Sequence, residues 1–445
     1  MPTTRDYEYL LECENVIGVD YDERADSVTV YVSQKVPPDE LDPEDEVKTR
    51  IKDIDGVDIN VEVVDCGYGE ERTGFDALSV LEPKPDAAED RQDRHRPVPA
   101  GVSEINAESS AATAGPYPAR VEDTSAATWS DDAEDGDLVR LSNNHVYARS
   151  NAAELGEPIV QPSPQDGGEL DEDEIGELLG YVPIDDGVLV DVAARSVNRD
   201  DESTTAFELE ESWPTAIRRG DYDDLQGETL TKSGRTTGVT SAELESTNAS
   251  VRVNFGGEHG PVLFRDQLIA GYMSEGGDSG SAVFSADGEL VGLLFGGSSQ
   301  QTILNKINNV EAEFGVELLT DEPESDGESD GNGDLVDEEI PIYTTSFDRT
   351  LEFEFVDAEL EPIAITLDEP PRSGESVPVT VTVLATDAGE YWLEVNDDRQ
   401  TFSIEDLEGA TNEAIEGEVT ATVSVPADEG EGLDIQLQGG RVRRS

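Results

Sequence analysis

The first part of the chain mixes short segments of alternating apolar and polar residues with one stretch of helical spacing. A period of two is typical of strands with one buried face, and apolar residues three to four positions apart are typical of a helix. The pattern predicts strands at residues 16–19, 28–32 and 57–63, and a helix at residues 43–54. We therefore expect a small α/β domain over residues 1–75.

The pattern changes after this domain. Residues 76–95 contain prolines and dense charge without apolar periodicity, which is typical of a linker or of a strap over the surface. Over residues 96–319, short apolar segments are separated by Gly, Asp, Asn and Pro, a rhythm typical of an all-β barrel or sandwich. One helix is expected near the end of this region, with Thr302 as its N-terminal cap and Gly315 after its last turn.

The remainder divides into an acidic stretch and a second β-rich region. Residues 320–340 are mostly Asp, Glu, Gly and Ser, so they hold too little apolar surface to fold and are predicted to be a disordered linker. Alternating apolar positions return over residues 341–445, where they predict an immunoglobulin-like β-sandwich. We therefore expect a mainly β protein with three folded domains.

The charge of the chain is extreme. It carries 103 Asp and Glu against 29 Lys and Arg, a formal net charge of -74. Such a chain repels itself in dilute buffer, and concentrated salt screens the repulsion because the Debye length falls to about 3 Å at 1 M. Disorder is the alternative, but 36% of the residues are apolar and fall in periodic segments. We predict a halophilic, salt-adapted protein.

Composition disfavours several functional classes. Nucleic acid is not an expected partner, because the most basic cluster is only Arg441, Arg443 and Arg444. The sequence shows no export signal and no run of 18 apolar residues, so we expect no membrane partner and a cytoplasmic protein. Three separated histidines and two cysteines do not make a metal site by spacing, so no metal or cofactor is predicted. Cys13 and Cys66 are expected to be buried thiols.

One serine lies in a glycine-rich turn between apolar segments, in the sequence Gly277-Asp278-Ser279-Gly280. A glycine before the serine allows the backbone to curl so that the amides of Gly277 and Ser279 point at one place, as an oxyanion hole requires. Gly280 is expected to leave room for substrate. Because so short a motif also occurs by chance in ordinary loops, a catalytic serine needs partners elsewhere in the chain.

Two candidate partners precede the serine. His145 stands where an apolar strand would pass into a short helix, although a lone histidine is more often structural than catalytic. Asp191 lies in the apolar sequence VLVDVA, where a buried carboxylate needs a donor such as the imidazole N–H of a triad. The alternative is that Asp191 caps a turn and Asp186 orients the histidine. The order His145, Asp191, Ser279 predicts a catalytic triad.

This order, with the sequences NNHV at 143–146 and GDSGS at 277–281, resembles that of chymotrypsin-like serine proteases. Within that class it is similar particularly to the disulfide-free bacterial branch that includes the HtrA-type proteases. Ser281 stands where the digestive enzymes have glycine, and no PDZ-like pattern follows, which departs from the HtrA proteases. The resemblance covers about half of the chain and implies a chymotrypsin-like double β-barrel over residues 96–319.

Further stretches at 141–146, 161–168, 190–194 and 232–238 are similar to the trypsin-like peptidases typified by the plant NARROW LEAF protein and its prokaryotic relatives. Those relatives also tend to carry a small N-terminal α/β unit ahead of the barrels. The resemblance therefore implies a member of this peptidase family, and residues 1–75 fit the expected N-terminal unit.

By analogy with these proteases, the substrate-binding residues are Met273, Phe295, Gly296 and Gly297. Met273 lies six residues before Ser279, where such enzymes frame the specificity pocket. Because Met273 is not acidic, a preference for Lys or Arg is not expected. The two glycines suit a tight β-turn equally well.

The sequence thus predicts a serine endopeptidase that acts on protein or peptide substrates. Ser279 would attack, His145 would carry the proton, Asp191 would orient His145, and Gly277 would help to bind the oxyanion. The alternative is a catalytically silent module in which the protease fold serves protein binding. The oligomeric state and self-cleavage stay open at this point.

Overall fold

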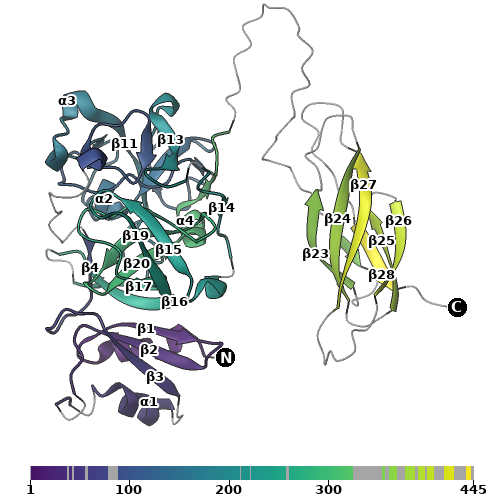
Figure 1. Ribbon diagram of the computed structural model, residues 1–445, viewed down its shortest axis with the longest axis horizontal. Coiled ribbons are helices and arrows are strands. Elements are labelled where there is room, and N and C mark those ends of the chain that lie inside the picture. The colour runs from purple at the N-terminus through teal and green to yellow at the C-terminus, as the bar shows by residue number, and fades with distance from the viewer. Residues whose placement is uncertain are drawn as a thin grey trace, which may run out of the picture. The chain divides into compact units, whose positions relative to one another are not determined.

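The structure is a computed structural model that describes residues 2–37, 40–42, 45–55, 59–78, 89–210, 212–220, 222–256 and 260–323, and seven strands beyond residue 352. The chain divides into two compact units, Met1–Glu322 and Pro323–Ser445, and each is described by itself (Figure 1). The predicted linker at 320–340 lies almost wholly outside the described residues. So do residues 79–88 of the predicted linker at 76–95.

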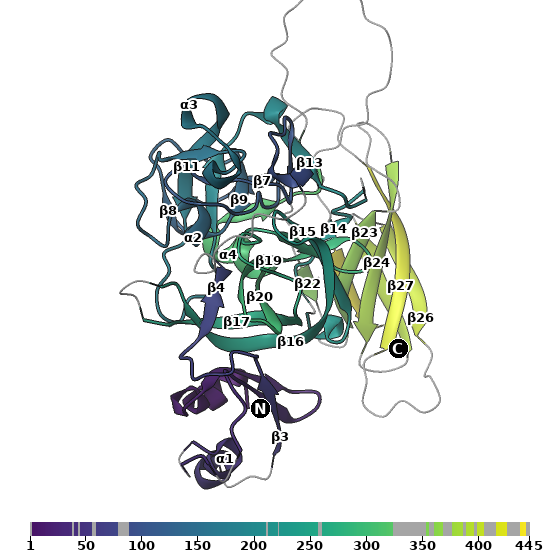
Figure 2. The ribbon, with the colours of Figure 1, turned by 60° about the vertical axis from the view of Figure 1, so that its left-hand side comes forward.

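Six strands of the first unit close into a barrel, here called the second barrel. They are β15 (Thr229–Gly234), β16 (Gly238–Asn254), β17 (Val262–Gly271), β18 (Ala282–Phe284), β19 (Glu289–Gly297) and β20 (Gln301–Lys306). The pairing order is β15-β18-β19-β20-β17-β16, and β16 pairs back to β15 (Figure 2). Side chains such as Leu268, Val291 and Leu304 are fully buried inside it.

The other barrel, here called the first barrel, is an eight-stranded sheet. Its strands are β6 (Ile105–Asn106), β7 (Ala119–Val121), β8 (Thr128–Trp129), β9 (Leu138–Ser142), β10 (Pro158–Val160), β11 (Glu174–Tyr181), β12 (Ala193–Ser196) and β21 (Val316–Leu318). The order is β21-β7-β9-β12-β11-β10-β6, with β8 beside β11. The mainly β, chymotrypsin-like double-barrel fold is therefore confirmed.

Short elements connect and flank the two barrels. They are β5 (Val98–Ala100), β13 (Glu202–Ala206), β14 (Ala216–Ile217), α2 (Asn144–Tyr147), α3 (Leu170–Asp173) and the 3-10 helices at Glu89–Gln92, Pro164–Asp166, Arg199–Asp201 and Tyr222–Leu225. β5 and β13 pair in parallel, and β14 adds to β19. Most of the chain between the barrel strands is therefore loop and single-turn helix.

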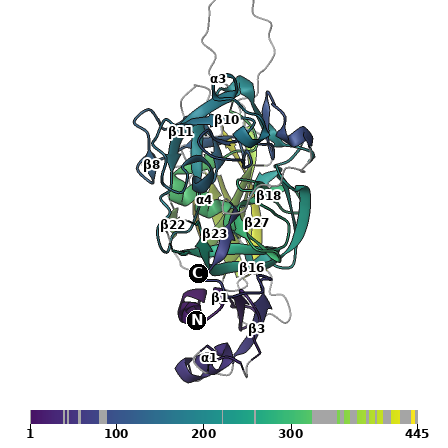
Figure 3. The ribbon, with the colours of Figure 1, turned by 90° about the vertical axis from the view of Figure 1, so that its left-hand side faces the viewer.

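The N-terminal residues form a small sheet that continues the second barrel. Its elements are a 3-10 helix (Thr4–Glu12), β1 (Val16–Asp22), β2 (Ser27–Val32), α1 (Val47–Asp55) and β3 (Asn60–Asp65). β1 pairs with β2 and also with β16, where Gly18 faces Val251, and β3 runs parallel to β2 (Figure 3). The predicted strands and helix are found here, although the helix begins at Val47 and the last strand at Asn60, each later than expected. Residues 43–44 and 57–58 of the predicted ranges lie outside the described residues. Cys13 and Cys66 are both buried.

A strand that the pattern did not predict, β4 (Phe75–Ala77), lies between β16 and β19. It pairs in parallel with β16, where Phe75 faces Val253, and antiparallel with β19, where Ala77 faces Gly296. Phe75 and Ala77 are fully buried. Three residues are too few to show a period of two, so the pattern assigned the last two of them to the linker.

The helix predicted to begin near Thr302 begins five residues later. Residues 301–306 are strand β20, paired with β17 and β19, and α4 runs over Ile307–Phe314. The early start was wrong because the apolar side chain of Ile303 belongs to the barrel sheet and not to the helix. Gly315 ends α4 in the left-handed conformation, as expected. Across the described ranges, no helix is long and apolar enough to span a membrane.

The second unit contains two sheets. Its strands are β22 (Phe353–Phe355), β23 (Leu360–Leu367), β24 (Ser376–Ala385), β25 (Gly389–Val395), β26 (Asp398–Ile404), β27 (Ile415–Ser424) and β28 (Leu437–Arg441). One sheet has the order β22-β28-β25-β26 and the other β23-β24-β27 (Figure 1). The alternating patterns of the sequence therefore mark true strands, and the immunoglobulin-like connection stays a prediction.

Two arginines and two glutamates are fully buried in the first barrel. Arg195 binds both acids, with its Nε 2.8 Å from Glu104 and its Nη1 2.7 Å from Glu202. Arg140 Nε lies 2.8 Å from Glu202, and all four side chains have no exposed surface. The hydroxyl of Tyr147, at the end of α2, donates to Glu104. The cluster therefore ties the short helix α2 to the barrel through charge-assisted hydrogen bonds.

The pKa of Glu104 gives this cluster a pH dependence. Burial raises the pKa of Glu104, but the charge and hydrogen bonds of Arg195, with Arg140 and Tyr147, outweigh burial and hold the pKa below its ordinary 4.5. A carboxyl whose pKa is lowered by folding stabilises the native state above the ordinary pKa, and this contribution is lost as the pH falls further.

We expect Glu104→Gln to lower the free energy of unfolding at neutral pH by about 3–5 kcal/mol, because Arg195 loses a buried partner. The difference from wild type should shrink as the pH falls below 4.5. Denaturant unfolding in concentrated salt over a pH series measures both. Glu108→Gln, at an exposed position, is the control, and equal stabilities of the two variants at neutral pH would contradict the expectation.

Candidate active site

The structure brings His145, Asp191 and Ser279 together. His145 Nδ1 lies 2.5 Å from Asp191 Oδ2, and His145 Nε2 lies 2.7 Å from Ser279 Oγ. The amide of His145 also donates to Asp191 Oδ1, over 3.1 Å. His145 comes from α2 of the first barrel and Ser279 from the loop before β18 of the second. Both distances are within hydrogen-bond range for a base, its orienting acid and a nucleophile.

Two asparagines hold the backbone of Asp191, and sequence reasoning missed both. Asn143 Nδ2 donates to the carbonyl of Asp191 over 2.9 Å, and the amide of Asp191 donates to Asn305 Oδ1 over 3.0 Å. All three residues are fully buried. Asn143 is the N-cap residue of α2, two positions before His145, which was a usable signal, whereas Asn305 is 114 positions from Asp191.

The alternative orienting acid lies elsewhere. Asp186 is exposed and accepts the backbone amide of Leu263 through Oδ1. It therefore holds a strand of the second barrel, and Asp191 is the carboxylate beside His145.

The turn around Ser279 has the curl that the sequence suggested. Gly277 has a φ of 97°, in the left-handed region that favours glycine. The carbonyls of Gly277 and Ser279 both accept hydrogen bonds from Thr113, at 2.8 Å and 2.9 Å. Within the part of the chain that the structure describes, no carbonyl or side chain accepts the amides of Gly277 and Ser279. The two N–H groups are therefore available to a bound oxygen.

Gly280 has a different role from the one expected. A Cβ on this residue would lie 2.1 Å from Ser142 Oγ and 2.4 Å from the carbonyl of Thr113, and its φ is 91°. The space beside Gly280 is taken by the first barrel and not by substrate. This glycine allows the two barrels to approach each other at the serine.

The carboxylate of Asp278 holds the turn that contains Ser279 in place through several hydrogen bonds. Its carboxylate accepts the amides of Thr236 and Thr237 at 2.8 Å and 3.1 Å, the hydroxyl of Thr237 at 2.7 Å, and the amide of Glu275 at 3.0 Å. The ammonium group of Lys232 lies 3.4 Å away, and both side chains are fully buried. Burial lowers the pKa of Lys232, and Asp278 opposes that shift.

The two motifs at 161–168 and 232–238 meet in the structure. Arg235 Nε lies 2.8 Å from Asp166 Oδ2, and its Nη2 also contacts that carboxylate. Asp166 accepts a further hydrogen bond from Ser103 Oγ, at 2.6 Å. The buried pair joins a loop of the first barrel to the hairpin of β15 and β16 that holds Asp278.

The four predicted substrate-binding residues are all buried. Gly296 and Gly297 pair with Ala77 and Asp76 of β4. Phe295 belongs to the same hydrophobic cluster as Phe75, and Met273 to the same cluster as Leu78. Their role in substrate binding stays a prediction, and the structure shows β4 of the same chain paired with the two glycines.

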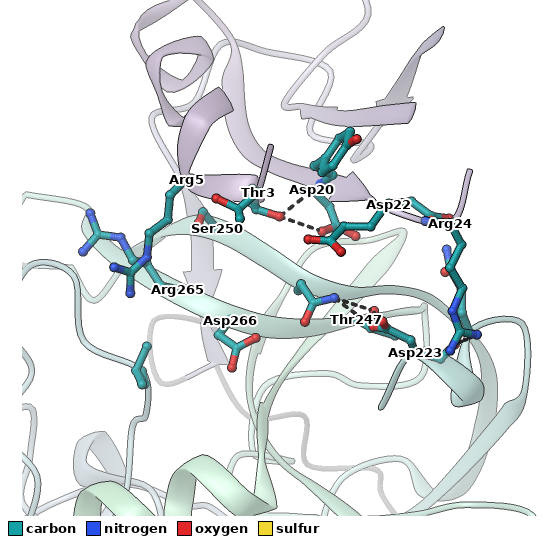
Figure 4. Close-up of a pocket in the computed structure, with 16 residues that line it drawn as sticks. Thr3, Arg5, Asp20, Asp22, Arg24, Asp223, Thr247, Ser250, Arg265 and Asp266 are labelled. Carbon is teal, nitrogen blue, oxygen red and sulfur yellow. Dashed lines mark hydrogen bonds between the residues drawn. The ribbon is translucent and has the colours of Figure 1, made fainter. Parts of the chain in front are cut away.

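A charged cavity of about 450 Å³ lies apart from these residues, between the N-terminal sheet and strands β16 and β17. Acids such as Asp20 and Asp266 and bases such as Arg5 and Arg265 line it (Figure 4). It contains no histidine, and His145, Asp191 and Ser279 are not among its lining residues. Within the described ranges, no group of three or more His, Cys, Asp or Glu could hold a metal ion.

The comparison with protein families gives one match. Residues 192–307 match the family described as Peptidase S46. The matched residues include Ser279 but make up well under half of the chain. No curated protein matches the chain.

Solved structures similar to the chain include three proteases. A glutamic acid specific serine protease, described as using a novel histidine triad in substrate binding, is 17% identical with a TM-score of 0.35, and the match covers 50% of this chain and 100% of that one. The chymotrypsin of Cellulomonas bogoriensis is 15% identical, with a TM-score of 0.34 and coverages of 50% and 99%. The Nocardiopsis protease NAPase is also 15% identical, with a TM-score of 0.32 and coverages of 50% and 98%.

The double β-barrel and the peptidase match define the class of the protein. The chain is a serine protease with a chymotrypsin-like fold. The specificity for glutamic acid is a property of the first of these proteases and is not assigned to this chain.

We expect Asp278→Asn to lower kcat/KM on a peptide substrate by about a hundredfold or more. An amide cannot accept all the donors that surround Asp278, and it leaves Lys232 without its buried partner, so the amides of the serine turn lose their position. Steady-state kinetics in concentrated salt measure the loss. Asp287→Asn, at an exposed position of the same barrel, is the control, and unchanged kinetics in the Asp278 variant would contradict the anchoring role.

Proposed function

We propose that this chain is a salt-adapted, cytoplasmic serine endopeptidase with His145, Asp191 and Ser279 as its triad. The observation that carries the proposal is the continuous chain of short contacts from Asp191 Oδ2 through the imidazole to Ser279 Oγ. The substrates are proteins or peptides, and no cofactor takes part. The oligomeric state is not needed for the mechanism, because one chain supplies all three groups.

The reaction follows from the positions of these groups. Ser279 Oγ attacks the carbonyl carbon of the substrate while His145 Nε2 takes the hydroxyl proton. Asp191 holds the Nδ1–H of His145 and stabilises the imidazolium ion. The carbon–nitrogen bond then breaks, the leaving amine takes the proton from Nε2, and an acyl group stays on Oγ. Water then attacks the acyl carbon while His145 Nε2 takes its proton, the bond to Oγ breaks as Nε2 returns the proton to Oγ, and the peptide acid leaves.

The oxyanion of the tetrahedral intermediate needs donors that are fixed in advance. The unaccepted amides of Gly277 and Ser279 are suited to this role, because Thr113 holds the carbonyls of both residues. No side chain has to move when the charge develops. Preorganised donors of this kind are worth about two to three powers of ten in rate each.

We also propose that the enzyme belongs to the NARROW LEAF-type peptidases. Support comes from the motif stretches that carry this resemblance. The stretches at 161–168 and 232–238 contact each other through Asp166 and Arg235, and the second stretch supplies Thr236 and Thr237 to Asp278. The motifs therefore form one support for the serine turn, which is a physical reason for them to occur together.

We expect Ser279→Ala to abolish hydrolysis of peptide substrates and labelling by a fluorophosphonate, because the attacking oxygen is removed. Labelling in multimolar salt, followed by intact mass, is the measurement. Ser241→Ala, an exposed serine on β16, should be labelled like wild type. Labelling of the Ser279 variant would rule out this nucleophile, and a folded wild type that binds proteins but never reacts would favour a silent binding module.

The proposed salt adaptation predicts a large effect of ionic strength on folding. With a net charge of -74, the chain should lose its tertiary structure when the salt concentration falls from a few molar to about 0.1 M, where the Debye length rises to about 10 Å. The melting temperature in a KCl series measures this. A melting temperature that is equal at both ends of the series would contradict salt adaptation.

A further inference from the structure

The predicted substrate-binding strand is already paired with a segment of its own chain. β4 runs antiparallel to the end of β19, with Ala77 opposite Gly296 and Asp76 opposite Gly297. An extended peptide that binds to the edge of a sheet makes such a pairing, in which main-chain hydrogen bonds give affinity and side-chain pockets give specificity. Position 297 itself has no room for a side chain, because a Cβ on Gly297 would lie 2.6 Å from the carbonyl oxygen of Gln301.

A tyrosine from the N-terminal part locks this pairing. The hydroxyl of Tyr68 donates to the carbonyl of Gly297 over 3.0 Å and accepts the amide of Asp76 over 2.9 Å. The bridge joins β4 to β19 through one side chain that lies eight positions before Asp76. The segment is therefore held from both of its neighbours, by Tyr68 and by the parallel pairing with β16.

The residue after β4, Leu78, belongs to the hydrophobic cluster of the second barrel. Leu78 has only 1% of its surface exposed and belongs to the hydrophobic cluster that contains Met273. Met273 was expected to frame that pocket, because it lies six residues before Ser279. An aliphatic side chain is the kind of group that such a pocket binds through burial of apolar surface.

The catalytic groups are covered in the same structure. Ser279 is 2% exposed and His145 is 4% exposed. The ring of Phe255, which follows β16, lies 6.0 Å from the ring of His145. Ser279 and His145 therefore have little exposed surface in this structure.

We propose that residues 75–78 occupy the substrate groove as an extended peptide substrate would, with Leu78 in the specificity pocket, and so inhibit the enzyme. The inference rests on the proposed function, and it adds a substrate class to it. The preferred substrate is an extended peptide with a medium-sized aliphatic residue on the acyl side of the bond that is cut. Substrate binds only to the fraction of molecules in which the segment has left, so the apparent affinity is reduced by that fraction.

Two variants that loosen the segment test the proposal. Leu78→Ala removes the side chain from the pocket, and Tyr68→Phe removes only the bridging hydroxyl while keeping the ring. The rate of labelling by a fluorophosphonate, measured on the full chain in concentrated salt, should rise at least about tenfold in Leu78→Ala and at least about threefold in Tyr68→Phe, because each raises the open fraction.

Each test variant has a control in which the same type of residue is changed in the same way at another position. Leu155→Ala shortens an exposed leucine of the first barrel, and Tyr21→Phe removes a hydroxyl that donates to Asp26 within the N-terminal part. Both should be labelled at the wild-type rate. If Leu78→Ala does not fold, as judged by circular dichroism, the conservative Tyr68→Phe variant decides the question.

The outcomes separate this inference from the proposed function. Equal labelling of wild type and both variants, in protein that does react at Ser279, would overturn the inhibition and leave the protease intact. Folded variants that never react would overturn the proposed function itself.

The substrate class is tested on Tyr68→Phe with peptides that differ only in the residue before the bond that is cut. Leu should be preferred over Lys and Glu by at least about tenfold, and a preference for either charged residue would overturn the assignment of Leu78.

Discussion

The close approach of the two barrels at Thr113 is the constraint on which the rest of the site depends. One residue of the first barrel holds the carbonyls of Gly277 and Ser279 in the second. The approach brings a histidine and a serine from different barrels to 2.7 Å. It is possible only because Gly280 has no side chain where Ser142 and Thr113 lie. The geometry of the serine turn and the meeting of the barrels are therefore one structural fact.

Charge has two different roles in this molecule. The excess of carboxylates over bases is carried by the chain as a whole, where only solvent and salt can compensate for it. Several ions are instead fully buried in pairs, as in the contacts of Arg195 with Glu104 and of Lys232 with Asp278. The desolvation of two buried charges offsets most of their attraction, whereas the loss of one partner leaves the other charge buried and unpaired. These pairs therefore fix the positions of the elements they join more than they add to the free energy of unfolding. The first pair contacts α2, which carries His145, and the second holds the turn that contains Ser279.

The sequence was sufficient for what local pattern and motif encode. The strands of the N-terminal sheet, the double barrel and the candidate residues His145, Asp191 and Ser279 all followed from periodicity, from short glycine-rich motifs and from a family resemblance. Contacts between distant positions did not follow, since nothing local in the chain marks Asn305 as the partner of Asp191. β4 was missed for a related reason, because a three-residue strand is defined by its neighbours β16 and β19 and not by its own composition.

The pairing of β1 with β16 has a consequence for how the protein can be divided. Where Gly18 and Val19 face Val251 and Ser250, the backbone groups of β16 are satisfied by the N-terminal sheet. A fragment that began after residue 65 would leave this part of β16 as an open edge with unpaired N–H and C=O groups. Open edges of long strands recruit other chains, so such a fragment would be prone to aggregate. The N-terminal sheet thus serves as a cover for the flank of the protease as well as a neighbour of it.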